Sequence, residues 1–327
     1  MTVKKKILWL SIVQGLAMLM VVLDHDNLWK VLYGHSDAIG HFVRSFHMAL
    51  FMFVSGGLFY MTRIKKEWKT KEVYKDKLLR LMLPYAAFTT VCFFLKASFS
   101  SYMKRGIGFN MHDFIYSYLC PGEGPLKEMW FLATLFTLML LYPIYKVLMK
   151  KVGGQILLFS VFLIIYVIKL FSDCGPWFNI NEFYLFGIWF VSGMIFFKNK
   201  WEVYLGKTWC CGLLFILLMS IHVIWDNMLF IMPCLGILWA ISFSLLMEKY
   251  VPSLFSSFRN YTFQIYLMGL FGQMFIELFI WKRIANIYLF PFFYVLSILV
   301  GLYIPVLISK KIEKMSNKYL NMVFGLK

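Results

Sequence analysis

Ten apolar stretches, each about 17 to 25 residues long, follow one another along this chain of 327 residues. A helix needs roughly 20 consecutive apolar residues to cross the hydrocarbon core of a bilayer, so each stretch can form one membrane span. Hydrophobic residues make up 61% of the chain and charged residues 15%, which is too apolar for a soluble domain of this length. The predicted spans are 7–28, 39–62, 78–98, 128–149, 155–171, 182–198, 208–225, 227–247, 261–281 and 289–309. The sequence therefore predicts an all-α, polytopic membrane helix bundle that forms a single domain over residues 1–327.

Lysine and arginine gather in alternate connections between these spans. Of the 33 basic residues, 24 fall on one side, and the remaining nine lie in the other connections or inside spans. The richer side includes Lys4–Lys6, the eight basic residues from Arg63 to Arg80, and the segment after Lys310. The positive-inside rule then places both termini in the cytoplasm. Most of the net charge of +17 is explained by topology and by contact with membrane lipid, so we expect no nucleic-acid partner.

The first span contains two polar residues on nearly one stripe. Gln14 and His25 are eleven residues apart, which is about three helical turns and roughly 16 Å along the axis. Asp24 and Asp26 flank His25. Ionisable residues are costly inside a membrane and usually mark a functional site, although a helix end that dips into water would also accommodate them.

A second histidine is expected at a similar depth. His47 begins the second span on the outer side, so the two imidazoles could face one cavity, or His47 could simply lie at the headgroup interface. A neutral imidazole can take a proton from an alcohol near pH 7, with a carboxylate to orient it. Asp24 and Asp26 lie about 100° to either side of His25 on the helix. They would reach His25 only at a frayed helix end, or they would contact His47 instead.

Two further groups of polar residues have both a functional and a simpler interpretation. Glu128 and Trp130 begin the fourth span at the outer level, where Trp130 could also be an interfacial aromatic residue. Lys77 and Arg80 enter the third span from the cytoplasm. They could bind the diphosphate or the 3′-phosphate of a coenzyme, or serve only topology and attraction to anionic lipid.

Nothing in the sequence predicts a metal site. The six cysteines show no CxxC spacing and lie mostly inside apolar stretches. The histidines lack the close spacing of an HExxH motif. We therefore expect membrane-buried thiols and no metal.

Four segments, taken in order, resemble the membrane acyltransferase 3 family. The first runs from Gln14-Gly to Asp24-His25 and has the family's eleven-residue step. The second, Phe-His-Met-Ala-Leu-Phe-Met-Phe-Val-Ser-Gly over residues 46–56, is similar to the family's FHMPLFFFLSG. The third, residues 77–85, resembles the family's basic entry that ends in Pro-Tyr. The fourth is Trp-Phe-Leu at 130–132 with Tyr-Pro at 142–143.

The resemblance implies a ten-helix integral enzyme that moves an acyl group, often acetyl from acetyl-CoA, to a hydroxyl of an envelope sugar or lipid. It carries the family's essential histidine onto His25, the second-helix histidine onto His47 and the basic entry onto Arg80. The chain departs from the family at three positions: Gln14 replaces the usual arginine, Asp24 the usual glycine, and Gly269 a late histidine of many relatives.

These observations together predict an O-acyltransferase of a cell membrane, most simply the bacterial cytoplasmic membrane. The donor would be acetyl-CoA or another acyl-CoA, and the acceptor an envelope glycan or glycolipid. The predicted catalytic residues are His25 as general base with His47, Asp24, Asp26 and Glu128. The predicted donor-binding residues are Gln14, Lys77, Arg80 and Trp130. The alternatives are a transporter of lipid-linked sugar or polysaccharide and a non-catalytic relative.

Overall fold

The computed structural model describes residues 7–35, 37–98, 100, 106–224 and 230–326. Helices account for most of this part of the chain, and none of it forms a β-strand. Eight of the helices are long and apolar enough to cross a membrane. A ninth crossing is possible if Lys127–Leu140 and Tyr142–Leu148, which meet at an angle of 52°, count as one span. The all-α membrane bundle predicted from the sequence is confirmed.

Each of the ten predicted spans corresponds to a helical segment. The apolar helix Thr208–Ile224 is the shortest of them and is not among the eight. The third segment begins at Thr70, eight residues before its predicted start, because a polar helical turn precedes its apolar part. The junction between the predicted spans 208–225 and 227–247 lies outside the described residues, as do the basic residues Lys4–Lys6.

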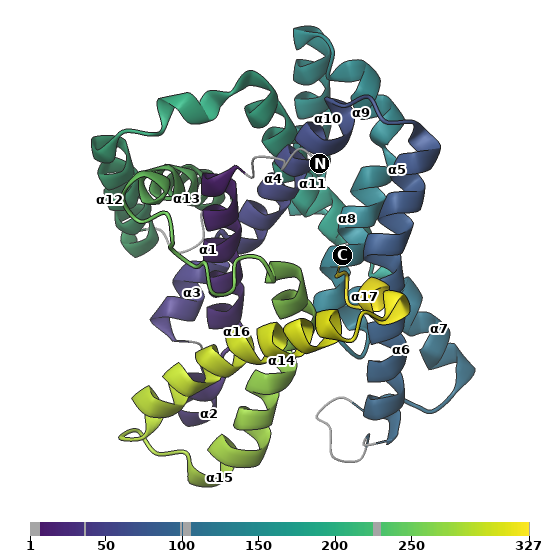
Figure 1. Cartoon of the computed structure of the whole chain (residues 1–327), viewed down its shortest axis with the longest axis vertical. Coiled ribbons are helices and arrows are strands. Elements are labelled where there is room, and N and C mark those ends of the chain that lie inside the picture. The colour runs from purple at the N-terminus through teal and green to yellow at the C-terminus, as the bar shows by residue number, and fades with distance from the viewer. Residues whose placement is uncertain (1–6, 36, 99, 101–105, 225–229, 327) are drawn as a thin grey trace. The chain divides into compact units, whose positions relative to one another are not determined.

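The helices group into two compact units, and each is described by itself. The first unit comprises residues 1–54 and 200–316. Its elements are α1 (Leu8–Asp24), α2 (Leu28–Tyr33), α3 (Ala38–Arg44), the first part of α4 (His47–Phe59), η7 (Trp201–Tyr204), α12 (Thr208–Ile224), α13 (Ile231–Tyr250), α14 (Thr262–Phe275), η8 (Ile276–Trp281), α15 (Lys282–Ile284) and α16 (Phe290–Lys314). Helix α1 packs against α3, α13, α14 and α16, so it lies at the centre of this unit (Figure 1).

The core of the first unit forms where α1 meets α14 and α16. Met18 and Val22 of α1 pack with Ile265, Leu302 and Val306 in one buried cluster. The buried amide of Gln273 donates to the carbonyl of Val22 at 2.8 Å, which ties α14 to α1. The interior is thus apolar, with single polar contacts that hold neighbouring helices in register.

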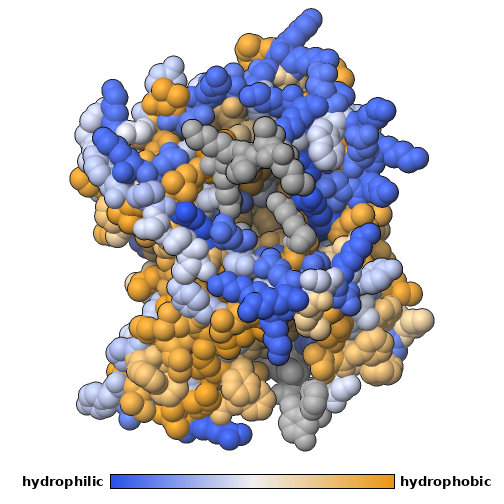
Figure 2. All heavy atoms as spheres, viewed as in Figure 1, coloured by the Kyte–Doolittle hydropathy of each residue, from blue (hydrophilic) through white to orange (hydrophobic). Residues whose placement is uncertain are grey.

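The outer faces of α14, η8 and α16 are also apolar. Figure 2 shows hydrophobic side chains over the lower left of the view, where Figure 1 places these helices. The exposed residues there include Phe271, Phe275, Phe279, Phe292, Val295 and Leu299. Exposed apolar surface of this kind suits contact with lipid.

The second unit comprises residues 55–199 and 317–327. Its elements are the end of α4, η1 (Tyr60–Ile64), α5 (Thr70–Lys77), η2 (Leu78–Met82), α6 (Leu83–Ser98), α7 (Met111–Leu119), η4 (Pro121–Glu123), η5 (Lys127–Met129), α8 (Trp130–Leu140), α9 (Tyr142–Leu148), α10 (Val152–Phe171), η6 (Trp177–Asn179), α11 (Ile180–Asn199) and α17 (Lys318–Val323). Helices α10 and α11 pack against each other, and α11 packs on α8. Gly56 allows α4 and α11 to approach each other closely, because a Cβ at this position would lie 1.9 Å from the carbonyl oxygen of Phe190.

Candidate functional site

The candidate site lies at the end of α1 that is predicted to face outward, where a short turn leads into α2. Asp26 and Asn27 interrupt the helix because their side chains hydrogen-bond to nearby backbone. The Asp26 Oδ1 atom accepts from the amide of Leu28 at 3.0 Å, and the Asn27 side chain donates to the carbonyl of His25 at 3.3 Å. The indole of Trp281 donates to the carbonyl of Leu28 at 2.9 Å. These bonds fix the turn that follows His25.

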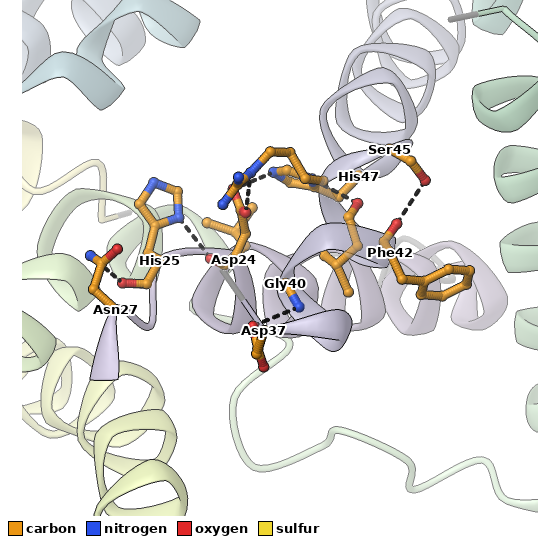
Figure 3. Close-up of polar contacts among 11 residues, drawn as sticks. Asp24, His25, Asn27, Asp37, Gly40, Phe42, Ser45 and His47 are labelled. Atoms are coloured by element: carbon orange, nitrogen blue, oxygen red, sulfur yellow. Dashed lines mark hydrogen bonds and ion pairs between the residues drawn. The ribbon is translucent and has the colours of Figure 1, made fainter. Parts of the chain in front are cut away.

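His25 is held by its own helix. Its Nδ1 atom lies 2.8 Å from the carbonyl oxygen of Val21 (Figure 3). A carbonyl can only accept a hydrogen bond, so the proton of the neutral imidazole is on Nδ1. The lone pair is then on Nε2, the atom that can act as a base.

His47 has the same internal anchor and a different charged neighbour. Its Nδ1 donates to the carbonyl of Val43 at 3.0 Å, and its Nε2 is 3.6 Å from Oδ2 of Asp24. The other carboxylate oxygen of Asp24 accepts from Nε of Arg44 at 2.8 Å. Asp24 therefore lies between a buried imidazole and a guanidinium (Figure 3).

The structure thus separates the two aspartates that flank His25. Asp24 turns to α3 and α4, where it contacts His47 and Arg44. Asp26 turns to the start of α2 and is 9% exposed. The two histidines lie within electrostatic range of each other. The site therefore brings Asp24, His25 and His47 together from α1 and α4, and their catalytic roles remain predictions.

Gln14 lies on the same uninterrupted helix as His25, because α1 is continuous from Leu8 to Asp24. Its side chain is half-buried and makes no hydrogen bond to any other described residue. The next residue, Gly15, admits the loop before α14: a Cβ there would lie 3.0 Å from Cβ of Phe255. A half-buried amide without a partner in a membrane helix is consistent with a position that faces a polar ligand.

Lys77 and Arg80 belong to a basic group in the second unit. Asp76 binds Arg63 at 2.7 Å, Arg80 at 2.9 Å and Lys77 at 3.6 Å. The Arg63 guanidinium also lies 4.0 Å from the centre of the Trp68 ring. Three cations on one carboxylate leave a surplus of positive charge. This arrangement can attract an anionic group.

Sequence reasoning did not single out Arg63 or Asp76. Arg63 entered only the count of basic residues for topology, and Asp76 is one of three acidic residues, with Glu67 and Glu72, in the run from Arg63 to Arg80. The available signal is the position of Asp76 between Lys75 and Lys77, since an acid between two cations forms ion pairs. The two π-helical turns η1 and η2, which hold Arg63 and Arg80, are not visible in the sequence, although such turns are frequent at functional sites.

Glu128 and Trp130 also lie in the second unit, apart in the chain from the histidines. Trp130 stacks on Phe186 with ring centres 5.1 Å apart, and its carbonyl accepts from Asn179 at 2.9 Å. These contacts join α8 to α11 and η6, so Trp130 has a packing role. Glu128 is half-buried in η5. Among the described residues, no group of three or more His, Cys, Asp or Glu side chains could hold a metal ion.

The model of one protein family matches almost the whole chain. It describes an acyltransferase domain, and the match covers residues 7–310. The chain belongs to this acyltransferase family. Its many apolar helices make it a multi-pass membrane acyltransferase. Neither the curated proteins nor the solved structures contain a significant match.

Proposed function

We propose that this acyltransferase moves an acyl group, acetyl in the first instance, from acyl-CoA to a hydroxyl of an envelope polysaccharide or glycolipid. The observation that carries the proposal is the hydrogen bond from Nδ1 of His25 to the carbonyl of Val21. It leaves the lone pair of the imidazole on Nε2, the atom that can accept a proton. Family membership supports acyl transfer in general. The bacterial cytoplasmic membrane is the proposed location.

In the proposed reaction, Nε2 of His25 removes the proton of the acceptor hydroxyl. The hydroxyl oxygen attacks the thioester carbonyl, an ester bond forms, and the carbon–sulfur bond breaks. The coenzyme leaves as a thiolate and takes the proton back from His25. The carboxylate of Asp24, next to His47, supplies negative charge near the imidazolium that exists between the two proton transfers.

Donor binding is assigned to two sets of polar residues. The amide of Gln14 can donate and accept, so it suits the amides of the pantetheine arm or the thioester carbonyl. Lys77 and Arg80 suit the phosphates of the coenzyme, and the surplus positive charge around Asp76 supports this assignment. Glu128 and Trp130 have no defined step in this proposal.

The test uses the purified full-length protein in lipid nanodiscs with radiolabelled acetyl-CoA. We expect release of coenzyme A and labelling of lipid-linked glycans from envelope extracts. His25→Ala should lower both roughly 10²–10⁴-fold, the usual contribution of a positioned base. His112→Ala is the matched control, because this side chain is 84% exposed and lies in the other unit.

Two results would reject the proposal. A His25→Ala protein with more than half the wild-type rate would remove His25 from the mechanism. Wild-type protein that neither hydrolyses acetyl-CoA nor transfers from it, in a preparation that melts cooperatively, would reject acetyl-CoA as the donor.

A further inference from the structure

Two buried polar atoms close to His25 in the chain have no hydrogen-bond partner among the described residues. They are Oδ2 of Asp26 and Nε1 of Trp29. Burying such atoms without a partner costs free energy, so buried polar groups that stay unpaired call for an explanation. A carboxylate oxygen can only accept a hydrogen bond and an indole N–H can only donate one. The two atoms are therefore complementary to a group that does both.

Neither atom is needed to build the turn between α1 and α2. The other oxygen of Asp26 already caps the amide of Leu28. The indole that holds this turn is that of Trp281, whose N–H donates to the carbonyl of Leu28. The turn therefore does not need the N–H of Trp29. The unpaired atoms of Asp26 and Trp29 thus remain available after the local fold is complete.

Both residues border the same stretch of α16. Ser297 offers a side-chain hydrogen bond to the carboxyl group of Asp26, although no described atom meets Oδ2 itself at full hydrogen-bond geometry. The ring of Trp29 packs edge-on against Phe290, with centres 5.1 Å apart. Phe290 packs in turn on Tyr294, whose hydroxyl donates to Asp37 at 3.3 Å. Carboxylate, hydroxyl and aromatic groups therefore line one short segment, residues 290–297.

We propose that Asp26 and Trp29 form the subsite for a sugar ring of the acceptor. One sugar hydroxyl would donate to Oδ2 of Asp26 and accept from Nε1 of Trp29, which satisfies both atoms. The aromatic ring of Trp29, which also packs on Tyr33 with centres 4.4 Å apart, offers an apolar surface to the face of the sugar. This inference rests on the proposed function, and it identifies where the acceptor is bound.

The same observations favour a hydroxyl over a cation. Asp37 and Glu277 lie within electrostatic range of Asp26, which by itself would attract positive charge. Asp37 is already bound by Tyr294, and Glu277 lies 3.9 Å from Lys282. The indole N–H presents a positive hydrogen, which a cation would avoid. A neutral group that donates and accepts meets both requirements.

Fluorine NMR tests the subsite directly. The full-length protein, with its eleven tryptophans replaced by 5-fluorotryptophan, is placed in nanodiscs, and the Trp29 resonance is assigned from Trp29→Phe. The probes are the methyl glycosides of glucose, galactose and N-acetylglucosamine, with cyclohexanol as the single-hydroxyl control. We expect at least one glycoside to shift the Trp29 resonance in a saturable manner, and cyclohexanol to shift it little.

Asp26→Asn is the decisive variant. Asparagine keeps the oxygen that caps Leu28 and replaces only the unpaired oxygen with an amide. Loss of this charged acceptor should weaken glycoside binding about tenfold or more. Trp209→Phe is the control, because Trp209 is 66% exposed on α12, and its loss should leave binding unchanged.

The inference is overturned if no glycoside shifts the Trp29 resonance, or if Asp26→Asn binds as tightly as wild type. A shift caused by Mg²⁺ or Ca²⁺ in place of the glycosides would also overturn it in favour of a cation site. Glycoside binding is measured without acyl-CoA, so failure of this inference can be distinguished from failure of the proposed function. Protein that binds glycosides but does not use acetyl-CoA would reject the donor while retaining the subsite.

Discussion

Asp24 lies between Arg44 and His47, and the two contacts differ in kind. Asp24→Asn removes the charged pair with Arg44, which is 52% exposed and screened by water, so we expect a loss of at most about 1 kcal/mol in stability. His47 adds no loss, because its proton is on Nδ1 and the lone pair on Nε2 can accept from the new amide. Arg44→Gln should cost about the same, since it removes the same charged pair. Thermal unfolding of both variants in one detergent compares them; a much larger fall in Tm for Asp24→Asn than for Arg44→Gln would show that His47 is charged and paired with Asp24.

Gln14 is the residue where this chain departs from the arginine of its family. Its amide makes no hydrogen bond to a described residue, so substitution breaks none. We expect Gln14→Arg to keep its Tm within a few degrees and to bind acetyl-CoA more tightly, because charge-assisted bonds are about twice as strong as neutral ones. Gln14→Leu, of similar size, should keep its Tm and lose donor binding. A large fall in Tm for Gln14→Arg, with no donor binding, would show that Gln14 does not face the donor.

For single residues, the sequence predicted the positions of the site but not all of its contacts. The positions of His25 and His47 follow from span order and spacing. The partners of Asp24 could not be predicted from the sequence, because helix geometry shows only that the side chains of Asp24 and His25 point in different directions. Whether it meets His47 depends on the tertiary approach of α3 and α4. The unpaired atoms of Asp26 and Trp29 depend on what α16 leaves unsatisfied, which no local pattern encodes.

At the scale of elements, the close packing of α14 and α16 explains why Gly269 is not a histidine. A Cβ at Gly269 would lie 2.8 Å from the carbonyl oxygen of Gly301, which is backbone and cannot move aside cheaply. We expect Gly269→Ala to destabilise the protein by about 1–3 kcal/mol, the usual cost of overpacking. Gly212→Ala in α12 is the control: a Cβ there meets nothing within 4 Å. It should be neutral or stabilising by up to about 1 kcal/mol. Equal Tm values for the two variants would refute this account.

Element boundaries were less predictable than element existence. The fourth span was predicted as one helix over 128–149, and the structure bends it by 52° between α8 and α9. Pro143 accounts for the break, because proline lacks an amide hydrogen and its ring clashes with the carbonyl four residues earlier. Pro305 lies inside α16 without ending it, so proline alone does not fix a boundary. Hydropathy locates apolar spans, but the bend depends on packing around the proline.

At the scale of the whole molecule, the existence and order of the apolar helices could be predicted because the bilayer fixes the length of an apolar helix. The predicted number of spans, ten, exceeds the eight or nine helices among the described residues that are long and apolar enough to cross. The sequence carries no comparable rule for which helices pack together. Helix α1 packs against α13, α14 and α16, more than 200 residues later in the chain. The grouping of residues 1–54 with 200–316 therefore came only from the structure.

The orientation of these spans gives a prediction for the whole molecule. The 24-to-9 division of basic residues places both termini in the cytoplasm and the connection around Gly106–Asn110 outside. Alkaline phosphatase is active only after export, so a fusion after Lys327 should be inactive and one inserted after Gly108 active. A green fluorescent protein at the same two positions should give the opposite pattern, which controls for expression. Activity of the phosphatase after Lys327 would mean an odd number of crossings. Thr208–Ile224, the shortest of the ten, would then be the segment that does not cross the membrane.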